Sequence, residues 1–224
     1  MLKAIIFDMD GVIADTERMY VAVKDMVLAG YGIKDIPLSY HRQFTGSTMS
    51  YQWKIMSKDF HLEHISMEEY LDTLYRCKDR YFEEKGIKPI RGSVEFVKQL
   101  KRAGYPLAIA SSGKLSEIKD TLRQVGLTEE FDVLTSGWEV KESKPEPDIY
   151  LLAAERLGFS PSECIVIEDS PLGNIGAKKG GFFCLGFTNK DFPMSDMKDA
   201  DERFESYDDV SVEYLENLLS SSKD

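Results

Sequence analysis

Two carboxylates near the start of the chain have a spacing that suggests chemistry. Asp8 directly follows the apolar run 4–7 (Ala-Ile-Ile-Phe), and Asp10 lies two residues further on, just before Gly11. Two like charges this close repel each other unless a cation or a shared proton relieves them. A turn aspartate that caps the next helix is a common alternative for Asp8 alone, but it explains the pair less well. The pair therefore points to a functional site.

Other polar residues also follow apolar runs. The run 4–7 lacks polar alternation, which is typical of a strand buried on both faces of a parallel sheet. Lys144 lies in the loop 142–147, after a short predicted strand at 131–134. The remaining polar residues at predicted strand ends are Ser111, after 106–110, and Glu168 and Asp169, after 164–167. Because the carboxyl ends of parallel strands share one edge, where ligands bind, we expect all these residues to converge.

The converging side chains are suited to phosphoryl transfer. Carboxylates without a nearby His or Cys favour a hard cation, and Mg²⁺ fits best because it takes a few carboxylates and keeps several waters. Lys144 and Ser111 suggest a phosphoryl group, whose charged oxygens need such an electrostatic clamp. Asp8 can then act as a nucleophile that forms an aspartyl-phosphate. Asp10 can protonate the leaving oxygen and later deprotonate water.

Each of these residues has a simpler explanation when it is taken alone. Lys144 would be a solvated loop lysine, and Ser111 would cap the helix that follows it. Glu168 and Asp169 would favour a helix N-terminus electrostatically. Only the joint arrangement of all these residues favours the functional interpretation.

The elements that must position these residues form an α/β pattern. The segment 16–85 has helical periodicity and no strand-like run, whereas strands and helices alternate from Gly92 onward. Alternation of this kind predicts a doubly wound parallel sheet with right-handed crossovers. We therefore expect a core formed by 1–15 and 89–224, with an inserted helical domain at 16–88. Within the core, the predicted strands are 4–7, 106–110, 131–134, 164–167 and 182–185, and helices are predicted to begin at Ser93, Asp148 and Pro171, with Ser170 as the cap of the last.

Composition narrows the class of partner. The 224 residues carry a formal net charge of −11, which disfavours nucleic acid and anionic membranes, because proteins that bind them are usually basic. The three cysteines form no CxxC pair and indicate neither a zinc site nor a disulfide framework. The N-terminus lacks a signal peptide pattern, and no apolar run has membrane-spanning length. We therefore expect a cytoplasmic monomer that acts on a small molecule.

Four ordered stretches resemble the motifs of the haloacid dehalogenase superfamily of phosphohydrolases, and most closely its β-phosphoglucomutase and sugar-phosphate phosphatase branch. The stretches are FDMDGVIADTE (7–17), ASSG (110–113), SKPEPDIY (143–150) and IEDSPLGN (167–174). The resemblance implies a Rossmann-like core with an inserted α-helical cap domain.

The resemblance also implies roles for individual residues. Mg²⁺ would be held by the Asp8 carboxylate, the Asp10 backbone carbonyl and Asp169, with Glu168 as a further contributor. Ser111 and Lys144 would bind the transferring phosphoryl group. The full set of predicted substrate-binding residues is Thr16, Gly46, Ser111, Ser112, Gly113 and Lys144.

The helical insertion decides between a phosphatase and a mutase. Mutases of this branch carry an arginine shortly after a glycine that resembles Gly46, and a histidine early in the first cap helix. Here Met49 and Tyr20 stand at those positions. Since a bidentate phosphate holder is not replaced conservatively by methionine, we predict a phosphatase that acts on a small phosphorylated metabolite, such as a sugar phosphate. The mutase remains the alternative, because Met49 and Tyr20 could be mere packing residues and the cations Arg42, Lys54 or Lys78 could hold the second phosphate.

Two hypotheses from other classes remain open. A receiver-like switch also uses a doubly wound sheet, a phosphorylatable aspartate, a lysine and Mg²⁺. It would lack the inserted cap and an acid–base residue such as Asp10, so both features speak against it. A catalytically silent binding protein on the same fold is disfavoured by the complete set of core residues.

Overall fold

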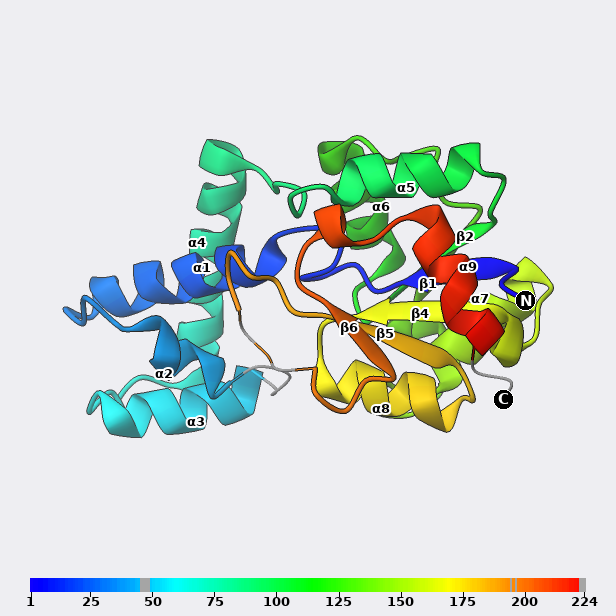
Figure 1. Ribbon diagram of the computed structural model, residues 1–224. Coiled ribbons are helices and arrows are strands. Elements are labelled where there is room, and N and C mark those ends of the chain that lie inside the picture. Colours follow the sequence, from blue (N-terminus) through cyan, green and yellow to red (C-terminus); the bar gives the residue numbers. More distant parts are fainter. Residues whose placement is uncertain (45–48, 194, 196, 222–224) are drawn as a thin grey trace. The chain divides into compact units, whose positions relative to one another are not determined.

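The chain folds into two compact units. The computed structural model (Figure 1) describes the whole chain except residues 45–48, 194, 196 and 222–224. The larger unit, here called the sheet unit, consists of Met1–Asp15 and Lys88–Asp224. The smaller one, the helical unit, consists of Thr16–Ile87. That the helical unit acts as a cap over a site in the sheet unit stays a prediction.

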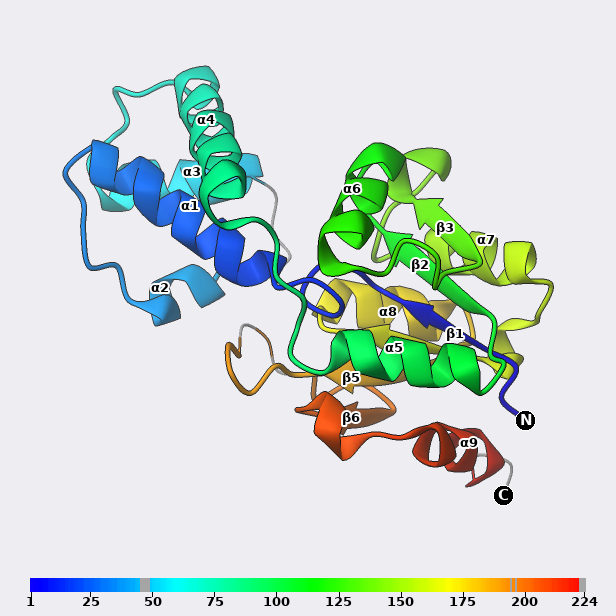
Figure 2. The ribbon, with the colours of Figure 1, turned by 90° about the horizontal axis from the view of Figure 1, so that it is seen from above.

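The sheet unit is built on a parallel sheet of six strands in the order β3-β2-β1-β4-β5-β6. All its neighbouring strands pair in parallel, and Figure 2 shows β3, β2 and β1 side by side. The strands are β1 (Ala4–Phe7), β2 (Leu107–Ser111), β3 (Val133–Ser136), β4 (Cys164–Glu168), β5 (Phe183–Phe187) and β6 (Glu202–Phe204). The predicted α/β fold with a doubly wound parallel sheet is thereby confirmed.

Helices cover both faces of the sheet, and α5 and α8 lie on opposite faces (Figure 1). Successive side chains of β1 point to opposite faces of the sheet. Because helices cover both faces, every residue of this strand is buried. Ala4 and Ile6 belong to an apolar cluster that also contains Ile149 and Ala153 of α7 and Ala177 of α8. The helices of this unit are α5 (Ser93–Arg102), α6 (Leu115–Val125), α7 (Asp148–Leu157), α8 (Pro171–Lys179) and α9 (Val212–Ser221).

The largest differences from the sequence prediction are at β3 and β6, whereas the bounds of β2, β4 and β5 differ from it by one or two residues. β3 begins at Val133 rather than at residue 131, because the Asp132 side chain accepts hydrogen bonds from the Leu107 amide and from Lys101 Nζ, at 2.9 and 2.5 Å, just before the strand. β6 was not predicted. Its sequence Glu-Arg-Phe has no apolar run, and two of its three side chains are exposed at the edge of the sheet.

The helical unit packs around its own apolar cluster. Its long helices α1 and α4 contact each other, and α3 packs on α4, where the Trp53 and Tyr70 rings stack with centroids 4.1 Å apart. Ser66 caps α4 by accepting a hydrogen bond from the Glu69 amide at 3.1 Å. The helices are α1 (Thr16–Gly30), α2 (Leu38–Arg42), α3 (Met49–Asp59) and α4 (Met67–Lys85).

No strand lies within the described part of 16–85, as the helical periodicity predicted. None of the helices in the described parts of the chain has the length and apolarity needed to span a membrane.

Candidate active site

The predicted residues meet at one edge of the sheet. Phe7, the last residue of β1, pairs with Ile109 on one side and with Ile167 on the other. Asp8 therefore leaves the sheet level with the ends of β2 and β4, and its amide donates to the Ile167 carbonyl at 2.9 Å. Ser111 and Glu168 are the last residues of those two neighbouring strands. The parallel register is thus what brings these distant stretches of sequence together.

Lys144 bridges two carboxylates at this edge. Its Nζ donates to Asp8 Oδ1 and to Glu168 Oε1, the latter at 2.5 Å. The side chains are almost fully enclosed, since Lys144 is 9% exposed, Asp8 8% and Glu168 0%. The simpler explanation of Lys144 as a solvated loop lysine is therefore wrong.

Glu168 is held by four hydrogen bonds. Its Oε1 accepts from Lys144 and from the Tyr150 hydroxyl at 2.8 Å. Its Oε2 accepts from the Ser170 amide and hydroxyl at 2.7 and 2.9 Å. A Cβ at Gly173 would lie only 1.9 Å from Oε1, so glycine at this position makes room for the carboxylate. These contacts favour a role for Glu168 in holding Lys144 over the predicted role as a metal ligand, which stays a prediction.

Sequence reasoning missed the role of Tyr150. This residue lies in α7, is fully buried, and places its ring 5.1 Å from Lys144 Nζ as well as bonding to Glu168. Its position at the end of the stretch SKPEPDIY could have indicated this role. There it is the one residue on the buried face of α7 that has a polar group at the end of its side chain. A buried tyrosine hydroxyl needs a partner, and Glu168 provides it.

The charges of this cluster act on one another. Burial raises the pKa of Asp8 well above its usual value, and the Glu168 and Asp10 carboxylates add to this rise although Lys144 opposes it. Burial also works against ionisation of Glu168, but the adjacent Lys144 ammonium outweighs it and lowers the Glu168 pKa. Burial disfavours the charged form of Lys144, yet Asp8 and Glu168 together raise its pKa well above normal. The site therefore favours ionised Lys144 and Glu168, and an added cation would favour ionised Asp8.

The loop after Asp8 folds back on itself. The amides of Ile13 and Ala14 both donate to the Met9 carbonyl, at 2.9 and 3.0 Å, and the Gly11 amide donates to the Ala14 carbonyl at 2.8 Å. Gly11 has a φ of 77°, and a Cβ there would lie 2.0 Å from Asp169 Oδ2. The Asp169 carboxylate thus packs directly against this loop, and only glycine allows both the turn and the approach.

Ser111 lies beside Asp10. Its hydroxyl donates to Asp10 Oδ2 at 3.3 Å and accepts from the Gly113 amide at 3.2 Å. The Gly113 carbonyl accepts from the Ser136 hydroxyl at 2.6 Å, which ties this turn to the end of β3. Ser112 is exposed and Gly113 is half-buried. Since the N-cap of α6 is Lys114, Ser111 does not cap that helix.

Two predicted substrate-binding residues belong to the helical unit. Thr16 is the first residue of α1 and is buried, whereas Gly46 lies outside the described residues. Tyr20 and Met49, the positions that argued for a phosphatase, both pack against the apolar cluster of the helical unit. This packing supports the alternative in which these two residues say nothing about the substrate.

The oxygen donors around Asp8 fit the implied Mg²⁺. The donor set consists of hard oxygens, and the one ammonium of Lys144 in these contacts offsets only part of the clustered negative charge of Asp8, Asp10 and Glu168. No group of three or more His, Cys, Asp and Glu side chains is arranged to bind a metal within the described residues. The implied set needs only the carboxylates of Asp8 and Asp169 and the Asp10 carbonyl, since Mg²⁺ keeps several waters.

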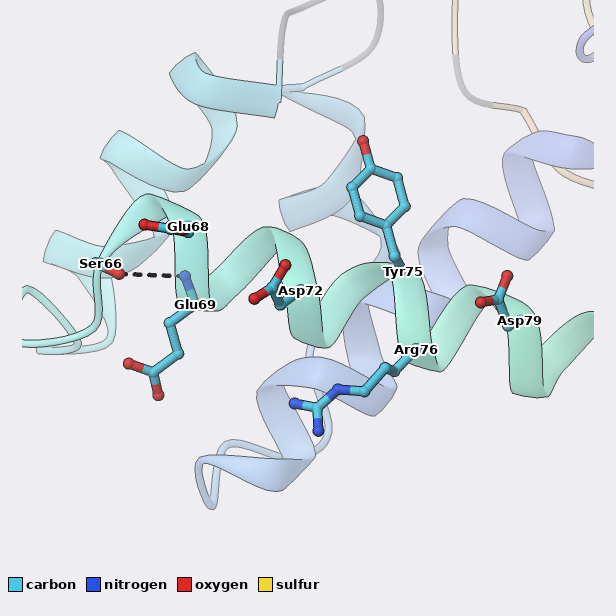
Figure 3. A pocket seen from close by; sticks show the side chains of 7 residues that line it. All are labelled: Ser66, Glu68, Glu69, Asp72, Tyr75, Arg76 and Asp79. Carbon is cyan, nitrogen blue, oxygen red and sulfur yellow. Dashed lines mark hydrogen bonds between the residues drawn. The ribbon is translucent and has the colours of Figure 1, made fainter.

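A separate pocket lies on the surface of the helical unit (Figure 3). It has a volume of about 660 Å³, and its lining side chains come from α4 and from its N-cap residue. Tyr75 and Arg76 point in different directions in this view, so the residues do not converge on one point. Its acidic lining repels a phosphate group. The pocket is lined by Ser66, Glu68, Glu69, Asp72, Tyr75, Arg76 and Asp79.

Comparison with known proteins places the chain in a family. The sequence profile of the haloacid dehalogenase-like hydrolases matches residues 5–187. The chain is similar to the Bacillus subtilis protein YhcW, with 33% identity over 99% of both chains. It is also similar to the phosphorylated carbohydrates phosphatase of Thermotoga maritima, with 36% identity over 80% of this chain and 82% of that one.

A solved structure extends the similarity to three dimensions. The hydrolase of this family from Deinococcus radiodurans, which was solved with bound phosphate and sodium, has a TM-score of 0.85 and 26% identity and covers 97% of both chains. The profile match, these identities and the shared fold agree, and the chain belongs to the haloacid dehalogenase-like hydrolase family.

Proposed function

We propose that this protein is a Mg²⁺-dependent phosphatase that hydrolyses a small phosphorylated metabolite, such as a sugar phosphate, through an aspartyl-phosphate on Asp8. The observation that carries the proposal is the buried Lys144 bridge between Asp8 and Glu168, with the Asp10–Ser111 pair beside it. This arrangement combines a nucleophile, a fixed cation and a second carboxylate at one sheet edge.

The first half of the reaction uses the pair of aspartates. The Asp8 carboxylate oxygen forms a bond to phosphorus while the bond from phosphorus to the leaving oxygen breaks. Asp10 gives its proton to that leaving oxygen. Ser111 and Lys144 stabilise the phosphoryl oxygens, on which charge is concentrated. The sheet edge supplies these groups at fixed positions, so little rearrangement is required.

The second half regenerates the enzyme. Asp10, now ionised, takes a proton from water, whose oxygen attacks phosphorus and releases the Asp8 carboxylate and inorganic phosphate. Glu168 and Tyr150 touch no substrate in this scheme. Their role is to hold Lys144 in place. Bound Mg²⁺, held by Asp8, the Asp10 carbonyl and Asp169, would offset the negative charge of the phosphoryl group and the carboxylates.

Two named relatives support the proposed substrate class. Named relatives act on phosphorylated carbohydrates in Thermotoga maritima and are hexitol phosphatases in Escherichia coli, at 29% identity over 80% of both chains. Thr16, Gly46, Ser112 and Gly113 are proposed to contact the substrate. The net charge of −11 and the acidic surface of α4 argue against nucleic acid as a partner.

The test is a substrate panel with two readouts. Purified protein with Mg²⁺ is given sugar phosphates and a generic aryl phosphate, and released phosphate is measured. Isomerised sugar phosphate is measured separately with a bisphosphate primer. We expect release to exceed isomerisation, and the opposite result would replace the phosphatase with the mutase.

A substitution tests the proposed chemistry itself. Asp8→Asn keeps the size of the side chain but removes the nucleophilic oxygen, so phosphate release should vanish while the fold persists. An active Asp8→Asn variant would refute the nucleophile. Failure to turn over any phosphate ester, together with stable phosphorylation of Asp8 by a small acyl phosphate, would favour the receiver-like switch.

A further inference from the structure

The loop that carries Asp10 is held from outside by two hydroxyl groups. The Tyr207 hydroxyl donates to the Val12 carbonyl at 3.0 Å, across 195 residues of sequence. The Ser93 hydroxyl donates to the neighbouring Ile13 carbonyl, also at 3.0 Å, and this carbonyl accepts from the Ile90 amide at 2.9 Å as well. Two successive carbonyls of the loop are thus fixed by segments that lie outside all four family motifs.

The ring of Tyr207 is rigidly seated. It lies in the short 3₁₀ turn Tyr207–Asp209 and packs against three phenylalanines, with ring centroids 5.2 to 5.4 Å apart. The residue is only 4% exposed. These three phenylalanines are Phe96, Phe187 and Phe204. Because the ring is buried among these three rings, packing fixes the position of its hydroxyl relative to the sheet.

The chain makes room for this tyrosine at Gly92. Gly92 has a φ of 84°, and a Cβ there would lie 2.8 Å from the Cβ of Tyr207. The next residue, Ser93, begins α5 and supplies the second hydroxyl. The two hydroxyls that contact the loop therefore come from segments that pack against each other at Gly92 and Tyr207.

The carbonyls that these hydroxyls hold are close to the proposed chemistry. Val12 is two residues from Asp10 and is fully buried, so its carbonyl has no access to bulk water. The loop's internal hydrogen bonds link Met9, Ile13 and Ala14, and a shift of Val12 is therefore passed on to Asp10. Misplacement of a catalytic group by about 1 Å can lower a rate about a hundredfold.

We propose that Tyr207, assisted by Ser93, is a positioning residue that holds the Val12 and Ile13 carbonyls and thereby fixes Asp10 and its backbone carbonyl relative to Asp8. This inference rests on the proposed function, because the consequence for turnover requires Asp10 to act in catalysis. The structural part, in which one hydroxyl stabilises the loop 9–14, does not depend on it.

Tyr207→Phe tests the inference, and Tyr105→Phe is its matched control. Both variants remove one tyrosine hydroxyl from the sheet unit, but the Tyr105 hydroxyl donates to Glu216 at 2.6 Å on the surface. We expect Tyr207→Phe to lower kcat about tenfold with little change in KM, and Ser93→Ala to have a smaller effect in the same direction. Tyr105→Phe should leave kcat unchanged.

Amide hydrogen exchange provides a readout without substrate or metal. In Tyr207→Phe the amides of Gly11, Ile13 and Ala14 should exchange faster, while those of β1 and β4 keep their wild-type rates. A Tyr207→Phe variant that matches Tyr105→Phe in both kcat and loop exchange would overturn the inference. Equal acceleration throughout the sheet with unchanged kcat would also overturn it, because the hydroxyl would then serve overall stability. Failure of the proposed function would instead show as a wild-type protein without phosphatase activity.

Discussion

Among the described residues, each unit of the molecule encloses one lysine almost completely, and the pKa values of these two lysines are shifted in opposite directions. Lys144 in the sheet unit and Lys24 in the helical unit both lie near an aromatic ring, 5.1 Å from Tyr150 and 5.9 Å from Phe44. Lys144 donates to two carboxylates, whereas Lys24 donates to the neutral amide oxygen of Gln52 at 3.3 Å. Both side chains are largely enclosed by the protein.

The partners decide how each lysine titrates. Burial disfavours the ammonium in both, but the carboxylates of Asp8 and Glu168 reverse the effect and raise the pKa of Lys144. At Lys24 burial prevails over the Glu17 and Asp25 carboxylates, and the pKa is lowered. The protein therefore favours the charged form of Lys144, at the proposed active site, and disfavours the charged form of Lys24, in the packing of the helical unit. Substitutions in each unit test this difference between the two lysines.

The largest effect is expected for Lys144→Met. It removes the ammonium that binds the phosphoryl group and leaves two buried carboxylates without their cation. Phosphate release should fall about a thousandfold, and the free energy of unfolding, measured with urea, should fall by about 3 kcal/mol. Lys141→Met is the control, because Lys141 is an exposed lysine of the same loop. A Lys144→Met variant as active as this control would contradict the proposed role.

Gly173→Ala should have the next largest effect. The new Cβ would lie 1.9 Å from Glu168 Oε1, and Glu168 cannot move aside without losing its hydrogen bonds. We expect a loss of about 2 kcal/mol in stability and a hundredfold lower kcat, roughly, because Lys144 shifts with Glu168. Gly30→Ala in α1 is the contrast from the helical unit, since a Cβ there meets nothing within 4 Å. Equal behaviour of both variants would mean that Glu168 is not confined.

Tyr150→Phe removes one of the four hydrogen bonds to Glu168 and keeps the packing of the ring. We expect kcat to fall about tenfold and the unfolding free energy to fall by about 1 kcal/mol. Tyr40→Phe is the control in the helical unit, where the Tyr40 hydroxyl donates to Asp59 at 2.8 Å. Unchanged kcat in Tyr150→Phe would show that the other three bonds suffice to place Glu168.

Lys24→Met should have the smallest effect. A methionine fills a similar volume without a charge to bury, so the unfolding free energy should stay within about 1 kcal/mol of wild type. Release of phosphate from an aryl phosphate should be unchanged. A loss of stability as large as that in Lys144→Met would abolish the distinction between the two lysines.

The pH dependence of the stability of Lys24→Met tests the lowered pKa of Lys24. Because the pKa of Lys24 is lower in the folded state than in the unfolded chain, the unfolded chain binds more protons between the two pKa values. The contribution of this group to wild-type stability therefore grows as pH rises toward the ordinary lysine pKa of 10.5. Lys24→Met lacks this pH-dependent contribution, so its free energy of unfolding relative to wild type should decline as pH rises toward 10.5. A constant difference across pH, measured by urea unfolding, would contradict the lowered pKa.

Much of the fold can be predicted from local sequence. The buried strand 4–7, the helix 148–157 and the Ser170 cap before Pro171 all occur as predicted, with Ser170 accepting from the Gly173 amide at 3.1 Å. These features depend on apolar runs and capping chemistry that lie within a few residues of each other. The edge strand β6 was missed because its pairing with β5, rather than its own composition, makes it a strand.

The candidate site also has features that local sequence predicts and features that it does not. The strand pattern alone predicts that Asp8, Asp10, Ser111, Lys144, Glu168 and Asp169 follow parallel strands and converge, because the carboxyl ends of parallel strands share one edge of the sheet. The sequence did not predict that Glu168 holds Lys144, that Tyr150 supports Glu168 or that Tyr207 reaches Val12, and the tertiary structure shows these three contacts. These contacts join residues from separate elements, and their distances depend on how whole helices pack on the sheet, which no local pattern specifies.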